Sequence, residues 1–298
     1  MQVSSFNGLN NTTDPLRLGV NWLAKANNVN VTSTGALSKR EGYSRVQTGS
    51  FASAFTTEDF SRFYASVDGY IQDFAGVRLY TLTSTRPVSW FELNEQVFFD
   101  NGTDSGVIQP DNEVWQWRDS GLADIPTIGA DGQELPSLYD PLPTGTHLVQ
   151  HWRGRVYAAQ YMPTENQTVL WFSKAMGFHL FNLDSDFILL PGKVEMLAPH
   201  GTALVIGTDA AIYAYTPEGL AQLADYGVVP GDHWTADGGR ILFWSVRGAC
   251  EAMPFKNLTE QQVSVAPGVN AGACLIQRGG QKRYLTVIQQ GNSPFNAF

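Results

Sequence analysis

Apolar residues alternate with polar ones in many short runs along this chain, and turns that contain glycine separate the runs. The clearest example covers residues 147–160, where Arg153-Gly154 divides two apolar runs. The same arrangement returns over residues 201–215 and 240–253. Alternation with period two over runs of this length predicts short antiparallel strands. The pattern therefore predicts an all-β fold.

The turns between the runs support this prediction. Asp68-Gly69 and Ala75-Gly76 divide residues 62–82 into three alternating runs, and Asn101-Gly102 supplies another tight turn. Asp-Gly and Asn-Gly between apolar runs are strong hairpin signals, because both residue types tolerate a positive φ. We expect consecutive strands to pair as hairpins.

The number of runs predicts the architecture. Roughly twenty short β runs occupy most of the chain, and a four-stranded propeller blade takes about 40–45 residues. We therefore predict a β-propeller of roughly five to seven small antiparallel blades, which removes sheet edges by closing into a ring. A large β-sandwich is the alternative.

Three segments depart from the strand rhythm. Residues 1–45 are predicted to form an N-terminal arm with a hairpin, and residues 16–27 carry a mixed apolar set that could form a short helix. Residues 46–298 would form the propeller-like domain. Within it, residues 119–146 and 177–191 are predicted to be looped insertions, because they are rich in turn residues and long loops commonly contact a partner.

The composition of the chain argues against some classes of function. Only 16% of the residues are charged, against about 25% in typical soluble domains. The net charge is −9 and no cluster of Lys and Arg occurs, which argues against a broad nucleic-acid footprint. The N-terminus lacks an export signal, and no run of about 18 apolar residues occurs. We expect no membrane partner and assembly in a cytoplasm.

The chain carries no recognisable catalytic signature. His147 and His151 would lie on one strand face, more than about 12 Å apart at 3.3 Å per residue, which is too far for a shared metal ion. Cys250 and Cys274 do not have a metal-type spacing. Gly-x-Ser-x-Gly, P-loop and dinucleotide motifs are absent from the sequence. We expect no enzyme activity, no cofactor and no metal.

One aromatic pair leaves two interpretations open. Trp115 and Trp117 alternate within residues 113–118. They could stack a sugar ring or fill a gap between blades, and packing is the preferred interpretation.

Several short motifs together resemble a class of tailed-phage virion proteins. They cover residues 6–11, 27–32 and 34–43 near the N-terminus, followed by Trp152-Arg-Gly-Arg155 and the runs at 204–215 and 239–248. The resemblance is to propeller-bearing tail hub, stabilisation or nozzle proteins. It implies a structural subunit of a symmetric ring around the DNA exit path in a phage tail.

The resemblance also implies partners and a location. Other copies of the chain, a portal or adaptor and further tail proteins would be the partners, and DNA would pass without specific binding during ejection. The chain would belong to the virion tail and be assembled in the host bacterial cytoplasm. A carbohydrate-binding or carbohydrate-active propeller, or a component of the distal tail tip or baseplate of a long-tailed phage, is the alternative.

Two sets of candidate site residues follow. Apolar residues of the two predicted insertions would form a protein interface: Leu122, Ile125, Ile128, Leu138, Phe178 and Phe181. Acidic residues grouped in one loop-rich stretch would line an acidic lumen that repels the phosphate backbone: Asp100, Asp104, Asp111 and Glu113.

Overall fold

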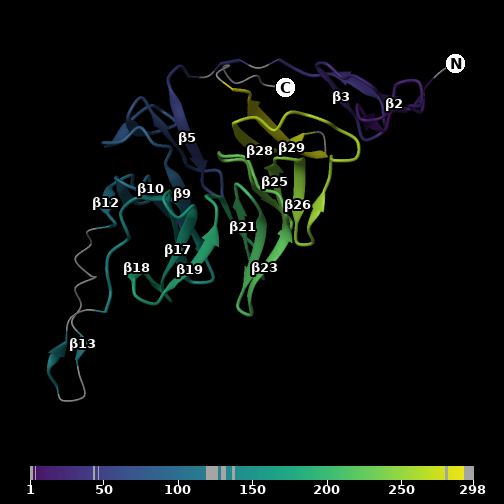
Figure 1. The fold of residues 1–298 in the computed structure, drawn as a ribbon. Coiled ribbons are helices and arrows are strands. Elements are labelled where there is room, and N and C mark those ends of the chain that lie inside the picture. Colours follow the sequence, from purple (N-terminus) through teal and green to yellow (C-terminus); the bar gives the residue numbers. More distant parts are fainter. Residues whose placement is uncertain are drawn as a thin grey trace. The chain divides into compact units, whose positions relative to one another are not determined.

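The computed structural model describes residues 3, 5–42, 44–45, 47–118, 127–128, 132–135, 138–278 and 281–291. Over these residues the regular secondary structure consists of β-strands joined by turns and bends (Figure 1). In this part of the chain no helix is long and apolar enough to cross a membrane. The prediction of an all-β fold is confirmed.

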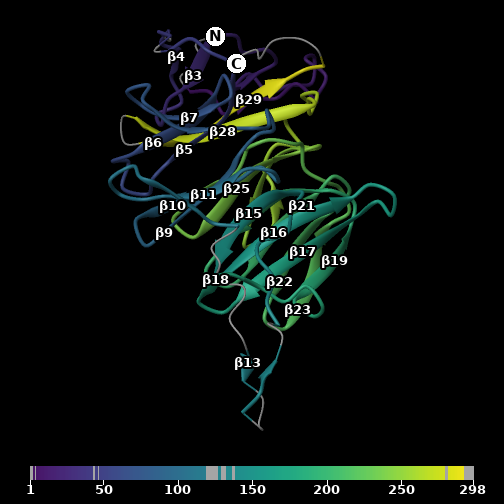
Figure 2. The same cartoon turned by 90° about the vertical axis from the view of Figure 1, so that its left-hand side faces the viewer.

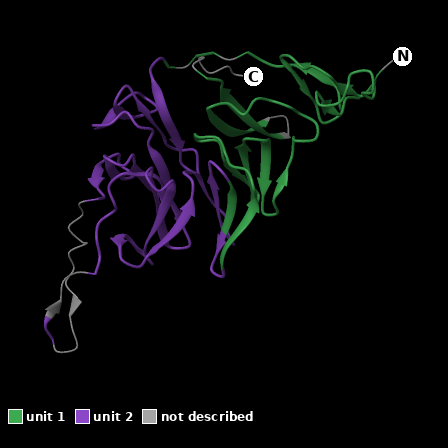
Figure 3. Cartoon of the chain, in the orientation of Figure 1, with its two compact units in different colours: residues 1–47, 211–214, 219–298 green, residues 48–210, 215–218 purple. Residues whose placement is uncertain are grey.

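The chain divides into two compact units (Figure 3). Unit 2 contains residues 48–210 and 215–218, and unit 1 contains residues 1–47, 211–214 and 219–298. Each unit is described by itself below.

Unit 2 is built from small sheets whose strands pair in chain order, except for one strand of the third sheet. The first sheet contains β5 (Phe51–Thr56), β6 (Phe63–Val67), β7 (Tyr70–Asp73) and β8 (Arg78–Thr81). The second contains β9 (Ser89–Leu93), β10 (Gln96–Asp100), β11 (Ser105–Ile108) and β12 (Val114–Gln116). The third contains β15 (Thr146–Trp152), β16 (Arg155–Met162), β17 (Gln167–Lys174), β18 (Gly177–Phe181) and β19 (Phe187–Pro191), with both β18 and β19 paired to β17. Strands β15, β16, β17 and β19 lie in this order in Figure 2.

Two further pairs belong to unit 2. Strands β20 (Val194–Pro199) and β21 (Leu204–Thr208) are antiparallel. Strands β13 (Thr127–Ile128) and β14 (Glu134–Leu135) form a short antiparallel pair within the predicted insertion.

The first strands of successive sheets in unit 2 are neighbours. Strand β15 contacts β9 on one side and β20 on the other. Side-chain hydrogen bonds join such first strands, among them Trp90 Nε1 to Ser53 Oγ at 3.1 Å, Val149 N to Ser89 Oγ at 2.9 Å, and His147 Nε2 to Val194 O at 2.7 Å. Four-stranded meanders with their first strands side by side are propeller blades, and a sandwich would instead pack two sheets face to face. The predicted propeller fold is therefore confirmed, and the β-sandwich alternative is wrong.

The second blade is covered on both faces, so adjacent apolar residues of one strand are both buried. In the second blade, Trp90 pairs with Phe99 and Phe91 pairs with Phe98. Trp90 and Phe99 join the core cluster with Tyr64 of the first blade. Phe91 and Phe98 join a second cluster on the opposite face. Adjacent residues of one strand thus enter different cores, because side chains alternate between the two faces.

Unit 1 contains the N-terminal elements and the C-terminal sheets. Strands β1 (Gly8–Leu9) and β2 (Trp22–Leu23) are parallel, and β3 (Val29–Val31) and β4 (Leu37–Lys39) form a hairpin. Most of β22 (Ile212–Thr216) and all of β23 (Gly219–Ala224) lie here. A four-stranded sheet contains β24 (Thr235–Asp237), β25 (Arg240–Ser245), β26 (Gly248–Ala252) and β27 (Lys256–Asn257), and β28 (Asn270–Arg278) pairs with β29 (Gln281–Gln289).

Two local predictions were wrong. Residues 16–27 form turns and strand β2 instead of a short helix, because Asp14 and Gly19 support turns there: Asp14 accepts from the backbone N–H groups of Leu16 and Arg17. Residues 177–191 form strands β18 and β19 instead of a looped insertion, since both segments find a partner along β17.

The N-terminal arm is held by a segment close to the other end of the chain. Asn11 Nδ2 donates to Ser264 O at 3.0 Å, Ser264 N donates to Asn11 Oδ1 at 2.7 Å, and Asn11 N donates to Gln262 O at 2.9 Å. These bonds lie within unit 1.

Replacing Asn11 with alanine should lower the stability of unit 1 slightly. The two side-chain bonds are exposed, so we expect a loss of about 1 kcal/mol, or roughly 2–4 °C in melting temperature. Differential scanning calorimetry would measure it. Leu16→Ala, at a side chain that is 94% exposed, is the matched control. Equal melting temperatures for both variants and the parent chain would contradict the role of the Asn11 bonds.

Candidate functional site: the Arg118 loop anchor

Two of the four residues predicted to line an acidic lumen are buried inside unit 2. Asp100 has 0% of its surface exposed and Asp104 has 4%. Both are in or beside the β10–β11 turn, where their carboxylates bind the chain's own donors. The lumen prediction is wrong for these two residues, because the turn folds back into the blade. Asp111 and Glu113 are exposed.

The β10–β11 turn is a network of side-chain hydrogen bonds. Asn101 Oδ1 accepts from the N–H groups of Thr103 at 3.0 Å and Asp104 at 2.7 Å, as in an Asx turn. Gly102 has a φ of 89°, and a Cβ at this position would lie 2.4 Å from Thr146 O. Only glycine therefore allows the turn to approach the start of β15 this closely.

Asp104 connects this turn to the preceding blade. Its carboxylate accepts from Thr83 N at 3.0 Å, Thr83 Oγ1 at 2.7 Å and Ser84 N at 3.1 Å. Burial opposes ionisation of Asp104, but the hydrogen bonds from Thr83 and Asn101 outweigh it and hold the pKa below its ordinary value. Asp104 is thus a structural carboxylate.

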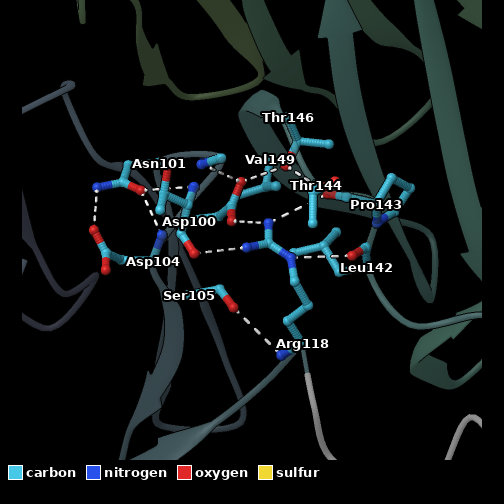
Figure 4. Close-up of polar contacts among 12 residues, drawn as sticks. Asp100, Asn101, Asp104, Ser105, Arg118, Leu142, Pro143, Thr144, Thr146 and Val149 are labelled. Carbon is cyan, nitrogen blue, oxygen red and sulfur yellow. Dashed lines mark hydrogen bonds and ion pairs between the residues drawn. The ribbon is translucent and has the colours of Figure 1, made fainter. Parts of the chain in front are cut away.

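Arg118 is the centre of the site (Figure 4). It follows β12 and precedes the predicted insertion at 119–146, and its side chain is 10% exposed. Its guanidinium donates to Asp100 Oδ1 at 2.7 Å and to three carbonyl oxygens: Thr103 O at 3.0 Å, Leu142 O at 3.1 Å and Pro143 O at 3.2 Å. Arg118 therefore joins the two ends of the insertion to each other and to the β10–β11 turn.

The ion pair at this anchor is buried on both sides. Asp100 Oδ2 accepts from Thr146 Oγ1 at 2.5 Å and from Gly102 N at 3.2 Å. Burial raises the pKa of Asp100 to about 6, although Arg118 and Thr146 favour the ionised form. A carboxylate so enclosed cannot reach a substrate, so its shifted pKa reflects structure and not acid–base catalysis.

The residues predicted to form an interface differ in their exposure to solvent, and some of them lie outside the described residues. Leu122 and Ile125 lie outside the described residues, and Ile128 is described only as part of β13. Leu138 is 59% exposed and Phe181 is completely buried. Phe181 pairs with Asp140 through its backbone and joins the core between the second and third blades, so its assignment to an interface was wrong.

Phe178 packs against the same core and is only partly buried.

His147 and His151, which were predicted not to share a metal ion, have different contacts. His147 bonds Val194 O, whereas His151 contacts the rings of Phe91 and Phe178. Among the described residues, no group of three or more His, Cys, Asp or Glu side chains could hold a metal ion.

A second feature of unit 2 combines arginine and aromatic side chains. A hollow of about 310 Å³ is lined by Trp152, Arg153, Arg155, Tyr157, Phe172, Tyr215 and Pro217. Arg153 lies over the Trp152 ring at 5.6 Å, and Arg155 lies over the Phe172 ring at 5.2 Å. Arginine, tryptophan and tyrosine are the residues that dominate protein–protein contacts. The candidate site residues predicted from the sequence included neither Arg118 nor the residues that line this hollow.

Sequence comparison assigns no family. No protein-family model matches the chain, and no curated protein matches it significantly. Solved structures with similar folds share little sequence with it.

Three of these structures illustrate the likeness. The AfRom2 CNH domain has 8% identity and a TM-score of 0.49, over 80% of this chain and 78% of that one. BBS1N, solved in complex with ARL6DN, has 12% identity and a TM-score of 0.46, over 88% of this chain and 84% of that one. The extracellular domain of a hybrid two-component system protein of B. thetaiotaomicron has 13% identity and a TM-score of 0.46, over 79% of this chain.

The chain spans about a third, 32%, of the B. thetaiotaomicron domain. All three TM-scores are below 0.5, and none of the three is a phage tail protein. The assignment of the fold therefore rests on the strand order and contacts of the chain itself.

Proposed function

We propose that this protein is a non-catalytic structural subunit of a bacteriophage tail, in which copies form a symmetric ring around the DNA exit path. The observation that carries the proposal is the Arg118 anchor. A buried guanidinium with four acceptors holds both ends of the long segment between Arg118 and Leu142 in place. Such a segment on a rigid blade suits contact with a neighbouring subunit.

Further observations support a subunit in an assembly. The chain has few charged residues, and the exposed Leu138 lies in the anchored segment. The arginine–aromatic hollow supplies a second surface of the composition found at protein contacts. A closed ring needs two different contact surfaces on each subunit, because the interface is heterologous. The anchored segment and the hollow are the candidates for these two surfaces.

The role of DNA in the proposal rests on charge. The net charge is −9, and Asp111 and Glu113 remain as exposed candidates for an acidic wall. Like charge repels the phosphate backbone and lets DNA pass without binding. A portal, an adaptor or other tail proteins would hold the ring in the virion.

Replacing residues 121–137 with a short Gly-Ser linker should abolish assembly and leave the fold intact. Arg118, Leu142 and Pro143 are retained, so the blade keeps its anchor and near-UV circular dichroism should be unchanged. We expect native mass spectrometry and negative-stain electron microscopy to show rings for the parent chain and monomers for the variant.

Phe60→Ala is the matched control, since Phe60 is an apolar side chain, 84% exposed, outside the anchored segment. It should assemble like the parent chain. A parent chain that stays monomeric, alone and with the proteins encoded beside it, would contradict the ring. Turnover of a polysaccharide by the purified protein would contradict the non-catalytic role.

A further inference from the structure

A second hollow of unit 2 lies between the second and third blades. Its volume is about 230 Å³, below the roughly 300–1,000 Å³ of sites for drug-sized ligands. Strands β10, β11 and β12 of the second blade supply most of its lining, and β18 of the third blade supplies Phe178 and His179. The size suits a ligand of a single ring.

The register of the second blade brings an aromatic face and two amides together. Trp115 lies opposite Val107 on the neighbouring strand, and Val97 lies opposite Ile108, so Gln96 and Gln109 are the next pair along. Gln96 Nε2 donates to Gln109 Oε1 at 2.7 Å. The hollow therefore contains a paired amide group beside an indole.

The two tryptophans of β12 and its end have separate roles. Trp117 is 2% exposed, contacts the rings of Phe91 and Phe98, and donates Nε1 to Phe178 O at 3.2 Å. It fills the gap between the blades. Trp115 is 54% exposed although it lines the same hollow. A large aromatic side chain left half in solvent at the mouth of a hollow offers a stacking surface.

Gln109 carries a donor that the protein does not use. The residue is 8% exposed, and its Nε2 is buried without a hydrogen-bond partner among the described residues. A buried donor left unpaired costs about 1–3 kcal/mol, and such groups in native structures call for an explanation. An acceptor on a ligand in the hollow would pair this amide.

The residues that line the hollow are uncharged, which limits the charge that a ligand can carry. Tryptophan, phenylalanine, valine and glutamine side chains surround the hollow, together with His179. Burial lowers the pKa of His179, which disfavours its charged form. A charged ligand would lose its hydration here without gaining a counter-ion. The ligand should be neutral, with one apolar face and several hydroxyl groups.

We propose that this hollow binds a neutral pyranose sugar, with one face of the ring stacked on Trp115 and a hydroxyl accepting from Gln109 Nε2. The site lies between two blades and does not depend on the proposed ring. A sugar site here would give the protein a means to engage a surface glycan.

The test is binding of methyl glycosides of glucose, galactose, mannose and N-acetylglucosamine to the full chain. Saturation-transfer NMR and tryptophan fluorescence should show at least one of them binding with a Kd of about 1–10 mM, the range expected for a ligand of this size. Trp115→Ala should weaken that binding at least tenfold, and Trp115→Tyr should retain part of it.

Gln109→Leu separates a binding role from a structural one. It removes the unpaired buried Nε2 and also the Oε1 that accepts from Gln96 Nε2. These two effects on stability oppose each other, so the melting temperature should change little, while sugar affinity should fall at least fivefold. Phe74→Ala, at an aromatic side chain 70% exposed elsewhere in unit 2, is the matched control and should bind like the parent chain. The proposal is overturned if none of the four glycosides binds at about 50 mM, or if the Trp115 and Gln109 variants bind as tightly as the parent chain.

Discussion

Replacing Arg118 with methionine should lower the free energy of unfolding by about 3 kcal/mol. The change leaves the Asp100 carboxylate buried without its cation and removes the donor from three carbonyl oxygens. Methionine fills much of the same volume, so lost packing contributes little. Urea denaturation followed by circular dichroism would measure the effect, with the midpoint lowered and the slope unchanged.

A second substitution distinguishes the ion pair from the carbonyl bonds. Asp100→Asn in the Arg118→Met background should recover part of the loss, because the unpaired charge is gone. Arg17→Met, at an exposed arginine of unit 1, is the matched control and should leave stability unchanged. A loss below about 1 kcal/mol for Arg118→Met would mean that the anchor contributes no more than a surface pair.

Acidification from pH 6.5 to pH 4 should remove the contribution that neutral His233 makes to stability. Burial lowers the pKa of His233 to about 4, and its Nδ1 accepts from Trp244 N at 3.1 Å. Below pH 6.5 this histidine binds a proton in the unfolded chain, but in the folded chain it does so only near pH 4, so the contribution of His233 to stability is lost as the pH falls. The full shift corresponds to about 3 kcal/mol.

His233→Asn tests this expectation. Asparagine keeps an acceptor for Trp244 and does not titrate, so the loss of stability between pH 6.5 and 4 should become shallower. Denaturation midpoints measured across this range would show it. Parallel pH profiles for the variant and the parent chain would contradict the assignment to His233.

Asp100 should act in the opposite direction over part of the same range. Its pKa of about 6 lies above the ordinary value of 3.8, so the folded chain binds a proton between pH 6 and 4 that the unfolded chain does not. This contribution to stability grows as the pH falls and is lost as the pH rises through 6. Asp100→Asn should therefore make the loss of stability on acidification steeper.

Local sequence determined the strands and turns. Asp68-Gly69 and Arg153-Gly154 join successive strands as predicted, and all four residues have positive φ, at 51°, 83°, 49° and 72°. Such turns depend on two neighbouring residues and on the alternation beside them. The all-β fold and its hairpins could therefore be predicted from the sequence.

Only the tertiary structure decided which side chains remained available for function. Asp100 and Asp104 form part of an acidic stretch in the sequence, yet both are buried and bind donors from other segments: Thr146 and Arg118 for Asp100, Thr83 for Asp104. In the sequence, Arg118 is an ordinary charged residue beside a turn-rich segment, and nothing near it indicates a structural role. Its role appears when Leu142 and Pro143, more than twenty positions later, lie beside it.

The aromatic residues follow the same rule. Trp115 and Trp117 share a strand face, and the sequence could not separate them. The third blade covers Trp117 and leaves Trp115 half exposed. Phe181 lies in a segment that was predicted to be a loop, but it is buried in the core between the second and third blades. Alternation assigns a residue to a face of its strand, but burial depends on the neighbouring blade that packs against that face.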